Sequence, residues 1–127
     1  ISDLPGFDIN ANNSLIRGFV INRFNNHGIL IFSGSNNVIA GNYIGTNVSG
    51  TAALPVAFSS VFVQGDNNII GGTSSADRNV LSGNGHQGVA IRSNGNQVKG
   101  NHIGTNAAGT AAVGGGGIFI FRGASNN

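Results

Sequence analysis

Few side chains in this sequence could do acid–base, metal or nucleophilic chemistry. The chain of 127 residues has no Cys and no Glu. Its carboxylates are four isolated Asp residues: Asp3, Asp8, Asp66 and Asp77. A polysaccharide lyase needs acidic residues gathered around a cation, with a basic proton acceptor, and a glycoside hydrolase needs paired carboxylates. Neither arrangement is visible, so we predict no catalytic residue, no metal site and no cofactor.

Two local motifs have chemical alternatives that we disfavour. Asp77 and Arg78 are adjacent in the sequence, which we interpret as a local ion pair or turn cap rather than as a catalytic pair. The glycine run at 114–117 lacks the Lys and Ser/Thr of a phosphate-binding P-loop. We therefore expect this run to be a flexible link to the last strand.

The composition indicates a chain that turns often between short apolar strands. Gly contributes 22 residues and Asn 20, and both types tolerate left-handed turns. Charged residues make up only 8% of the chain, which argues against exposed helices and against disorder. The six basic residues are scattered and no apolar run is long enough to cross a bilayer, so we predict neither nucleic-acid binding nor membrane insertion.

The elements that position the side chains follow from an internal repeat. The phrase GNYIGTN at 41–47 returns as GNHIGTN at 100–106, a shift of 59 residues (100 − 41 = 59). A phrase of glycine followed by alternating apolar residues recurs more often, and Ser60 replaces the glycine once. Its copies begin at Gly6, Gly28, Ser60, Gly88 and Gly117. These steps predict a rung of about 22 residues with insertions, and four full rungs with part of a fifth.

Each rung contains two further apolar phrases, so we predict three short strands per rung and a triangular coil. Alternation directs a set of apolar side chains inward. They are Phe7/Ile9, Ile29/Ile31, Val61/Val63, Val89/Ile91 and Ile118/Ile120 in the first strands, Ile16, Ile39, Ile70 and Val98 in the second, and Ile21, Ile44, Leu81 and Ile103 in the third. A leucine-rich repeat is the alternative, but Leu is uncommon here.

The phrases NNIIGGT at 67–73, RNVLSGN at 78–84, GNYIGTN and GNHIGTN resemble those of right-handed parallel β-helix repeat proteins of bacterial secreted and surface polypeptides. The resemblance covers nearly the whole chain. It implies an all-β fold, a right-handed parallel β-helix of about four to five three-strand rungs, over a single domain at 1–127. We expect this domain to be a fragment or repeat module of a longer chain. The wider pectate-lyase-like group contains carbohydrate enzymes, adhesins and structural repeats, and a fold alone does not choose among them.

Polar columns should accompany the apolar ones in such a stack. Asn42, Asn79 and Asn101 point inward near glycine bends, where an amide is able to bond to its copies above and below. We interpret them as a structural Asn ladder, and sugar binding is the alternative. His27 and His86 precede strands two rungs apart, roughly 10 Å by strand spacing, which is too far to share a metal ion.

The outward positions of the first strands are less regular and more informative. Several are large and apolar: Leu30, Phe32, Phe62, Phe119 and Phe121. An exposed aromatic patch on a polar coil indicates a covered surface. The cover is another chain or domain, the neighbouring loop 56–58, or a flat ligand such as a sugar ring.

These features predict a non-catalytic structural, assembly or adhesion module of a secreted or cell-surface protein. We expect its partners to be copies of itself, end to end or side by side, or other domains of the same polypeptide. The alternative is a carbohydrate-binding or lyase-like β-helix acting on a polysaccharide.

Overall fold

The computed structural model describes residues 3–127, and their strands form three sheets. The first sheet contains β1 (Phe7–Asn10), β4 (Ile29–Ser33), β7 (Val61–Val63), β10 (Gln87–Ile91) and β13 (Gly116–Ile120). The second contains β2 (Leu15–Arg17), β5 (Val38–Ala40), β8 (Ile69–Gly71) and β11 (Gln97–Lys99). The third contains β3 (Val20–Ile21), β6 (Tyr43–Ile44), β9 (Val80–Leu81) and β12 (His102–Ile103). One 3-10 turn, η1 (Ser75–Asp77), precedes β9.

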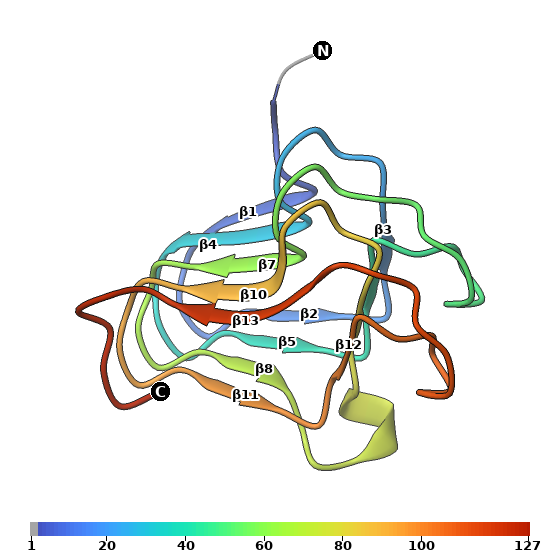
Figure 1. Cartoon of the computed structure of the whole chain (residues 1–127). Helices are drawn as coiled ribbons and strands as arrows, with labels where there is room; N and C mark the ends of the chain where they lie inside the picture. The colour runs from blue at the N-terminus through green and yellow to red at the C-terminus, as the bar shows by residue number, and fades with distance from the viewer. Residues whose placement is uncertain (1–2) are drawn as a thin grey trace.

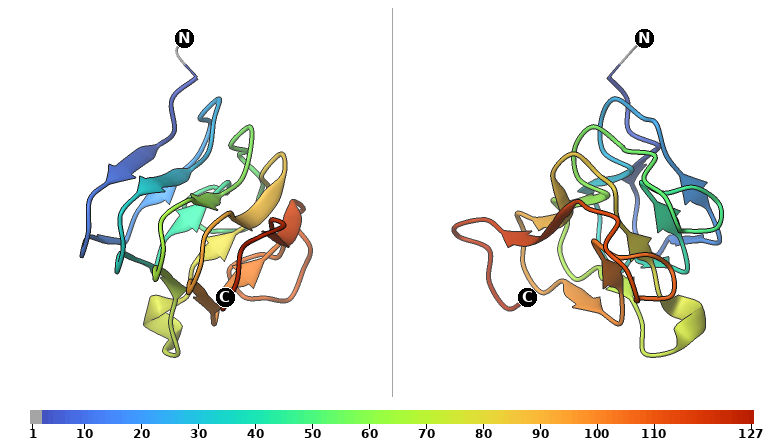
Figure 2. Two further views of the ribbon diagram at one scale, coloured as in Figure 1. Left: turned by 90° about the vertical axis from the view of Figure 1, so that its left-hand side faces the viewer. Right: turned by 45° about the vertical axis from the view of Figure 1, so that its right-hand side comes forward.

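All the strand pairs within these sheets are parallel, and each rung of the coil adds one strand to each sheet (Figure 1). The chain is therefore a parallel β-helix, with four three-strand rungs and the further strand β13. The views in Figure 2 show the rungs lying side by side along one axis, with the N-terminus at one end. The predicted fold class and the predicted strands are confirmed.

The core is the inside of the coil, where equivalent side chains stack in register. Ile29, Val61 and Val89 are paired across neighbouring strands and fully buried. Columns from the second and third sheets, such as Ile39 with Ile70 and Ile44 with Leu81, complete it. The exception to the predicted core is β13, where Ile118 and Ile120 align with the buried column but are 49% exposed. β13 is an edge strand of the described sheet, so no further rung covers them.

Left-handed residues turn the chain from the first sheet to the second. In four rungs an Asn with φ between 57° and 60° stands at this corner: Asn13, Asn36, Asn67 and Asn126. In the remaining rung Gly95 takes the same conformation, with φ of 68°. Asn and Gly are the residues that adopt it at least cost, which explains the repeated Asn-Asn pairs in the sequence.

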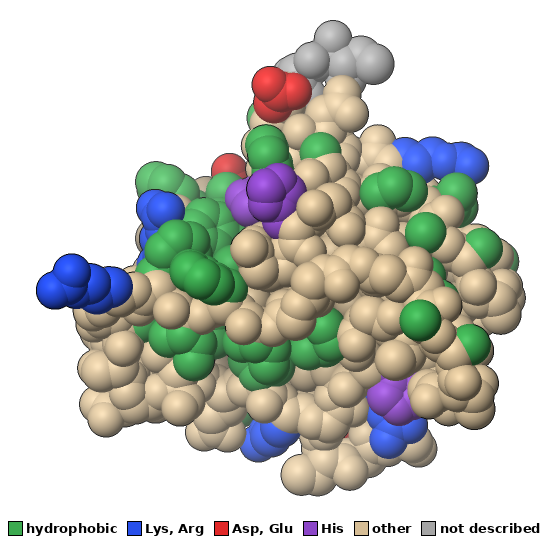
Figure 3. Space-filling model, viewed as in Figure 1, with side chains coloured by type: hydrophobic (Ala, Val, Ile, Leu, Met, Phe, Trp, Pro, Cys, Tyr) green, Lys and Arg blue, Asp and Glu red, His purple; other side chains and the backbone are tan. Residues whose placement is uncertain are grey.

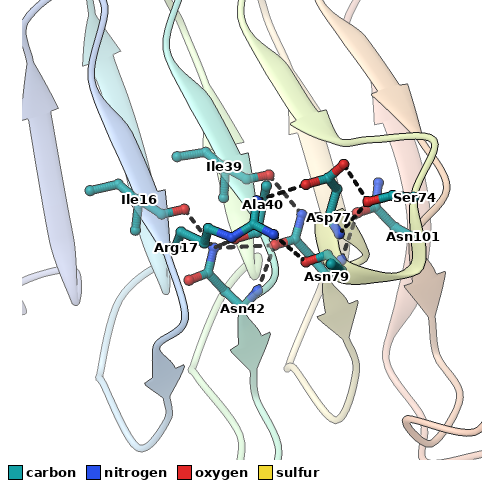
Figure 4. A network of polar contacts seen from close by, with 10 residues as sticks. Ile16, Arg17, Ile39, Ala40, Asn42, Ser74, Asp77, Asn79 and Asn101 are labelled. Atoms are coloured by element: carbon teal, nitrogen blue, oxygen red, sulfur yellow. Dashed lines mark hydrogen bonds and ion pairs between the residues drawn. The ribbon is translucent and has the colours of Figure 1, made fainter.

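The inward amides of Asn42, Asn79 and Asn101 form a continuous chain of hydrogen bonds, here called the first Asn ladder (Figure 4). The backbone N–H of Asn42 donates to Oδ1 of Asn79 at 2.9 Å, and that of Asn79 donates to Oδ1 of Asn101 at 3.2 Å. Each side-chain amide also donates to the carbonyl of the middle residue of the second-sheet strand in the preceding rung, as Asn79 does to Ile39 at 2.8 Å. Asn42 and Asn79 are fully buried.

A second Asn ladder runs along the other corner, immediately before the strands of the second sheet. Its members are Asn37, Asn68, Asn96 and Asn127. The N–H of each of the first three donates to Oδ1 of the next member at 2.8–2.9 Å. The ladder residue follows the left-handed residue in the chain, so each pair supplies one turn former and one amide that satisfies buried backbone.

The IGTN phrases begin two projecting loops, one after β6 and one after β12, visible on the same side of Figure 1. Each loop is closed by an antiparallel bridge, Thr46 to Ala53 and Thr105 to Ala112. The two loops meet although one rung separates them, since the N–H of Ala107 donates to the carbonyl of Gly50 at 2.9 Å. The 59-residue repeat therefore marks two similar loops that contact each other.

The register of β1 and β4 shifts after Ile9, so that Asn10 pairs with Ser33. One local prediction was wrong. The run at 114–117 is not a flexible link throughout, since β13 already begins at Gly116. Only Gly114 and Gly115 keep the positive φ values, near 100°, that require glycine.

The first Asn ladder predicts that Asn79→Ala destabilises the fold. The variant removes the side-chain partner of two groups, the N–H of Asn42 and the carbonyl of Ile39, while Oδ1 of Asn101 keeps only the backbone N–H of residue 79. We expect a loss of about 3 kcal/mol in the free energy of unfolding, measured by urea denaturation. Asn25→Ala, at an exposed position, is the matched control and should lose little. Equal losses in the two variants would contradict a supporting role for the ladder.

Candidate functional site

The predicted apolar surface lies on the outer face of the first sheet. Leu30, Phe62 and Phe119 fall in one column, which Asp8 begins and Ala90 interrupts. Phe119 is 47% exposed, whereas Leu30 and Phe62 are half-buried. Phe32, the most exposed at 58%, stands beside the register shift of β4.

Ring contacts join this surface to side chains outside the predicted set. Phe119 meets Phe121 edge to face at 4.8 Å between centroids, and Phe121 lies 6.0 Å from Phe62. The ring of His27 lies 4.8 Å from Phe62 and 5.5 Å from Phe58, and Phe58 lies 5.5 Å from His86. We call these six residues the aromatic row: Phe119, Phe121, Phe62, His27, Phe58 and His86. Such spacings are those of favourable ring pairs.

The loop at 56–58 is part of the coil rather than a flap over the face. Val56 is fully buried in the core, and its carbonyl accepts a hydrogen bond from the N–H of Gly85. Phe58 is held by the N–H of His86, which donates to its carbonyl, and is 41% exposed. The loop therefore extends the aromatic row and leaves Phe119 uncovered.

The two histidines stand on either side of Phe58 and do not form a metal site. No group of three His, Cys, Asp or Glu residues comes together within residues 3–127. The N–H of Ser59 donates to Nδ1 of His27 at 3.2 Å, a bond that requires this nitrogen to be unprotonated. Burial lowers the pKa of His27 from its ordinary value of 6.5, and the nearby His86 acts in the same direction.

Arg92 completes the site from the position directly after β10. Its guanidinium carbon lies 4.2 Å from the ring centroid of Phe121 and 5.4 Å from that of Phe62, within cation–π range. A groove of about 250 Å³ opens between this cation and the histidines. Figure 3 shows this face, with apolar side chains gathered below the histidines and cationic side chains at the left edge.

The carboxylates do not converge on this groove. Asp77 pairs with Arg17, 60 residues away in the chain, at 2.7 Å, rather than with the adjacent Arg78 (Figure 4). Of the two predicted alternatives, the turn cap is present as bonds between Ser74 and Asp77, and the ion pair of Asp77 is made with Arg17 instead of Arg78. The hydrogen bond from Ser74 makes the largest contribution to lowering the pKa of Asp77, and the hydrogen bond from Arg17 lowers it further.

Comparison with known proteins adds no relative. The chain matches no protein-family model, no curated protein and no solved structure at a significant level. Within the described part of the chain, no helix has the length and apolar character needed to span a membrane.

Sequence reasoning found the face but not the complete site. Leu30, Phe32, Phe62, Phe119 and Phe121 are all on the first sheet or directly after it. The sequence places Arg92 in the same outward series, and that was the available signal for a cation among the rings. The contacts of His27 and His86 depend on Phe58, which reaches them from an insertion whose path the repeat does not specify.

The environment of His27 predicts that stability falls on mild acidification. The unfolded chain takes up a proton near pH 6.5, whereas the folded chain resists protonation of His27 until a lower pH. The unfolded state therefore binds more protons in this window, and the free energy of unfolding decreases as the pH falls below about 6.5. Urea denaturation at a series of pH values between 7.5 and 5 measures this.

His27→Asn is the variant that isolates the effect. The Asn carbonyl is able to accept from the N–H of Ser59 but does not titrate, so the pH dependence should shrink. His102→Asn, on the third sheet, should retain the wild-type dependence. An unchanged pH slope in His27→Asn would show that His27 is not its source.

Proposed function

We propose that this chain is a non-catalytic β-solenoid module that acts in assembly or adhesion, with the outer face of the first sheet as its contact surface. The aromatic row is the observation that carries the proposal. Elsewhere in the coil, large apolar side chains mostly point inward, whereas here a continuous series of rings lies on the outside. Monomeric proteins rarely expose contiguous apolar patches without a function.

The chemistry of the face supports binding rather than catalysis. Its cation, Arg92, is stacked on rings and is paired with no carboxylate among residues 3–127. A proton-transfer mechanism needs a base within hydrogen-bond reach of an acid or a substrate proton. Rigid rings on a regular sheet provide contact area at low entropic cost, which is what an interface needs.

The proposal also includes the location of the protein. The resemblance of the repeated phrases to secreted β-helix proteins supports a secreted or cell-surface location. The second candidate, carbohydrate binding, is favoured by the ring faces of Phe62 and Phe119, because pyranose rings stack on aromatic side chains.

Self-association of the chain is the direct test. We expect sedimentation velocity to show a mass that rises reversibly with concentration. The double variant Phe32→Ala/Phe119→Ala removes the two most exposed Phe rings of the predicted surface, 58% and 47% exposed. It should weaken association at least tenfold, since burial of one such ring contributes about 1.5–3 kcal/mol.

Leu15→Ala is the matched control, because Leu15 is 61% exposed on the second sheet. It should leave association unchanged.

A glycan array with the same variants tests the second candidate, carbohydrate binding. A wild-type chain that stays monomeric at all concentrations and binds no glycan would overturn the proposal, and glycan binding that depends on Phe62 and Phe119 would replace it with the carbohydrate function.

A further inference from the structure

The outer column of the first sheet contains one small side chain between two large ones. Ala90 is aligned with Phe62 on one side and with Phe119 on the other. Its own surface is 3% exposed, so neighbouring side chains rise around it. The missing volume at Ala90 creates a notch in the aromatic row, and the groove lies over this residue.

The groove has rings for walls and few polar groups. Phe62 and Phe121 line one part, and Phe58 with the two histidines lines another. Its volume of about 250 Å³ is below the range of roughly 300–1,000 Å³ typical of drug-sized ligand pockets. The groove is therefore suited to a ligand of one ring rather than to an extended one.

Its permanent charge, that of Arg92, is positive and has no carboxylate partner. The single ion pair of residues 3–127 joins Arg17 to Asp77, and the Arg92 guanidinium lies over the rings of Phe62 and Phe121. His27 and His86 are the other titratable groups of the lining, and no Asp belongs to it. Asp66, in the turn after β7, accepts a hydrogen bond from the N–H of Asn94 at 2.8 Å, and Asp8 lies in the outer column three strands from Ala90. That is roughly 14 Å by strand spacing, beyond the Debye length of about 8 Å at physiological salt.

The groove offers few polar partners, which favours one of two classes of anionic ring ligand, sugar acids and aryl carboxylates, over the other. A sugar acid has several hydroxyl groups, and each loses hydrogen bonds to water on burial unless the site replaces them. Besides Arg92 and the histidines, the polar lining consists of Ser59 and Gln87, which already bond to each other at 3.3 Å. An aromatic ring needs no such partners and stacks on Phe62. The carboxylate is then the one strongly polar group, and it pairs with Arg92.

We propose that the groove over Ala90 binds an aryl carboxylate, a single aromatic ring with an attached carboxylate, whose ring packs on Phe62 and whose carboxylate accepts hydrogen bonds from Arg92. The inference deepens the proposed function, because it assigns a ligand class to part of the same contact surface. No covalent step is involved.

Benzoate is the probe, and chemical-shift changes of backbone amides on titration are the measurement. We expect saturable changes centred on Gln87, Ala90 and Arg92, with a dissociation constant on the order of 1 mM for so small a ligand. Benzyl alcohol, acetate and glucuronate separate the contributions of ring, carboxylate and sugar. Each should bind at least tenfold more weakly than benzoate. Equal binding of benzyl alcohol, or of glucuronate, would overturn the proposal.

Three variants at two outward positions test the geometry. Arg92→Gln should weaken benzoate binding at least tenfold, and Arg92→Lys should give an intermediate loss, because it keeps the charge but not the planar donor pair. Ala90→Leu should abolish binding by filling the notch. Thermal unfolding of each variant confirms folding. Undiminished benzoate binding in folded Arg92→Gln or Ala90→Leu would overturn the assignment.

Phe32→Ala separates this inference from the proposed function. Phe32 belongs to the predicted contact surface and is 58% exposed, but it does not line the groove. Its removal should weaken self-association while benzoate binding stays within twofold of wild type. A chain that associates but shows no benzoate site refutes the ligand assignment alone, and a monomeric chain with an intact benzoate site refutes the assembly function alone.

Discussion

The hydrogen bond from a buried backbone N–H to an Asn side chain of the next rung is the interaction on which the coil depends. A chain that bends three times per rung interrupts its strand pairing at every corner and leaves buried backbone groups to be satisfied. The two Asn ladders meet this need at two corners, with N–H to Oδ1 distances of 2.8–3.2 Å. An amide serves where an apolar residue cannot, because it accepts from one rung and donates to another.

This constraint limits the residue types of the inward columns, whereas the residue types of the outward columns are not limited by it. The columns of Ile, Val and Asn must repeat from rung to rung, because each copy packs on the copies above and below it. The outward column of the first sheet obeys no such rule, and it changes from Asp8 to Leu30, Phe62, Ala90 and Phe119. The aromatic row and the notch at Ala90 occur where the sequence departs from its own repeat. A site specific to this chain is therefore to be sought there rather than among the repeated phrases.

The sequence predicted what depends on periodicity and missed what depends on insertions. Alternation alone placed Ile39 and Ile70 inside and Phe62 and Phe119 outside. It could not place Arg17 beside Asp77, because η1 projects from an insertion before β9 and the two residues are 60 apart. The same holds for Phe58, whose contacts with the histidines depend on the path of the loop at 56–58. The second ladder had a signal in the sequence, an Asn or Gly directly before an Asn, but such a pair is equally typical of a surface turn.

Amide hydrogen exchange tests the central claim most directly. The backbone amides of Asn37, Asn42 and Asn68 lie outside the strands and donate to the ladder side chains. If the Asn ladders hold the rungs together, these amides exchange only through global unfolding, as slowly as the core amides of β4 and β7. Exchange of these three amides at rates close to that of Val48, which is 78% exposed in a projecting loop, would contradict it.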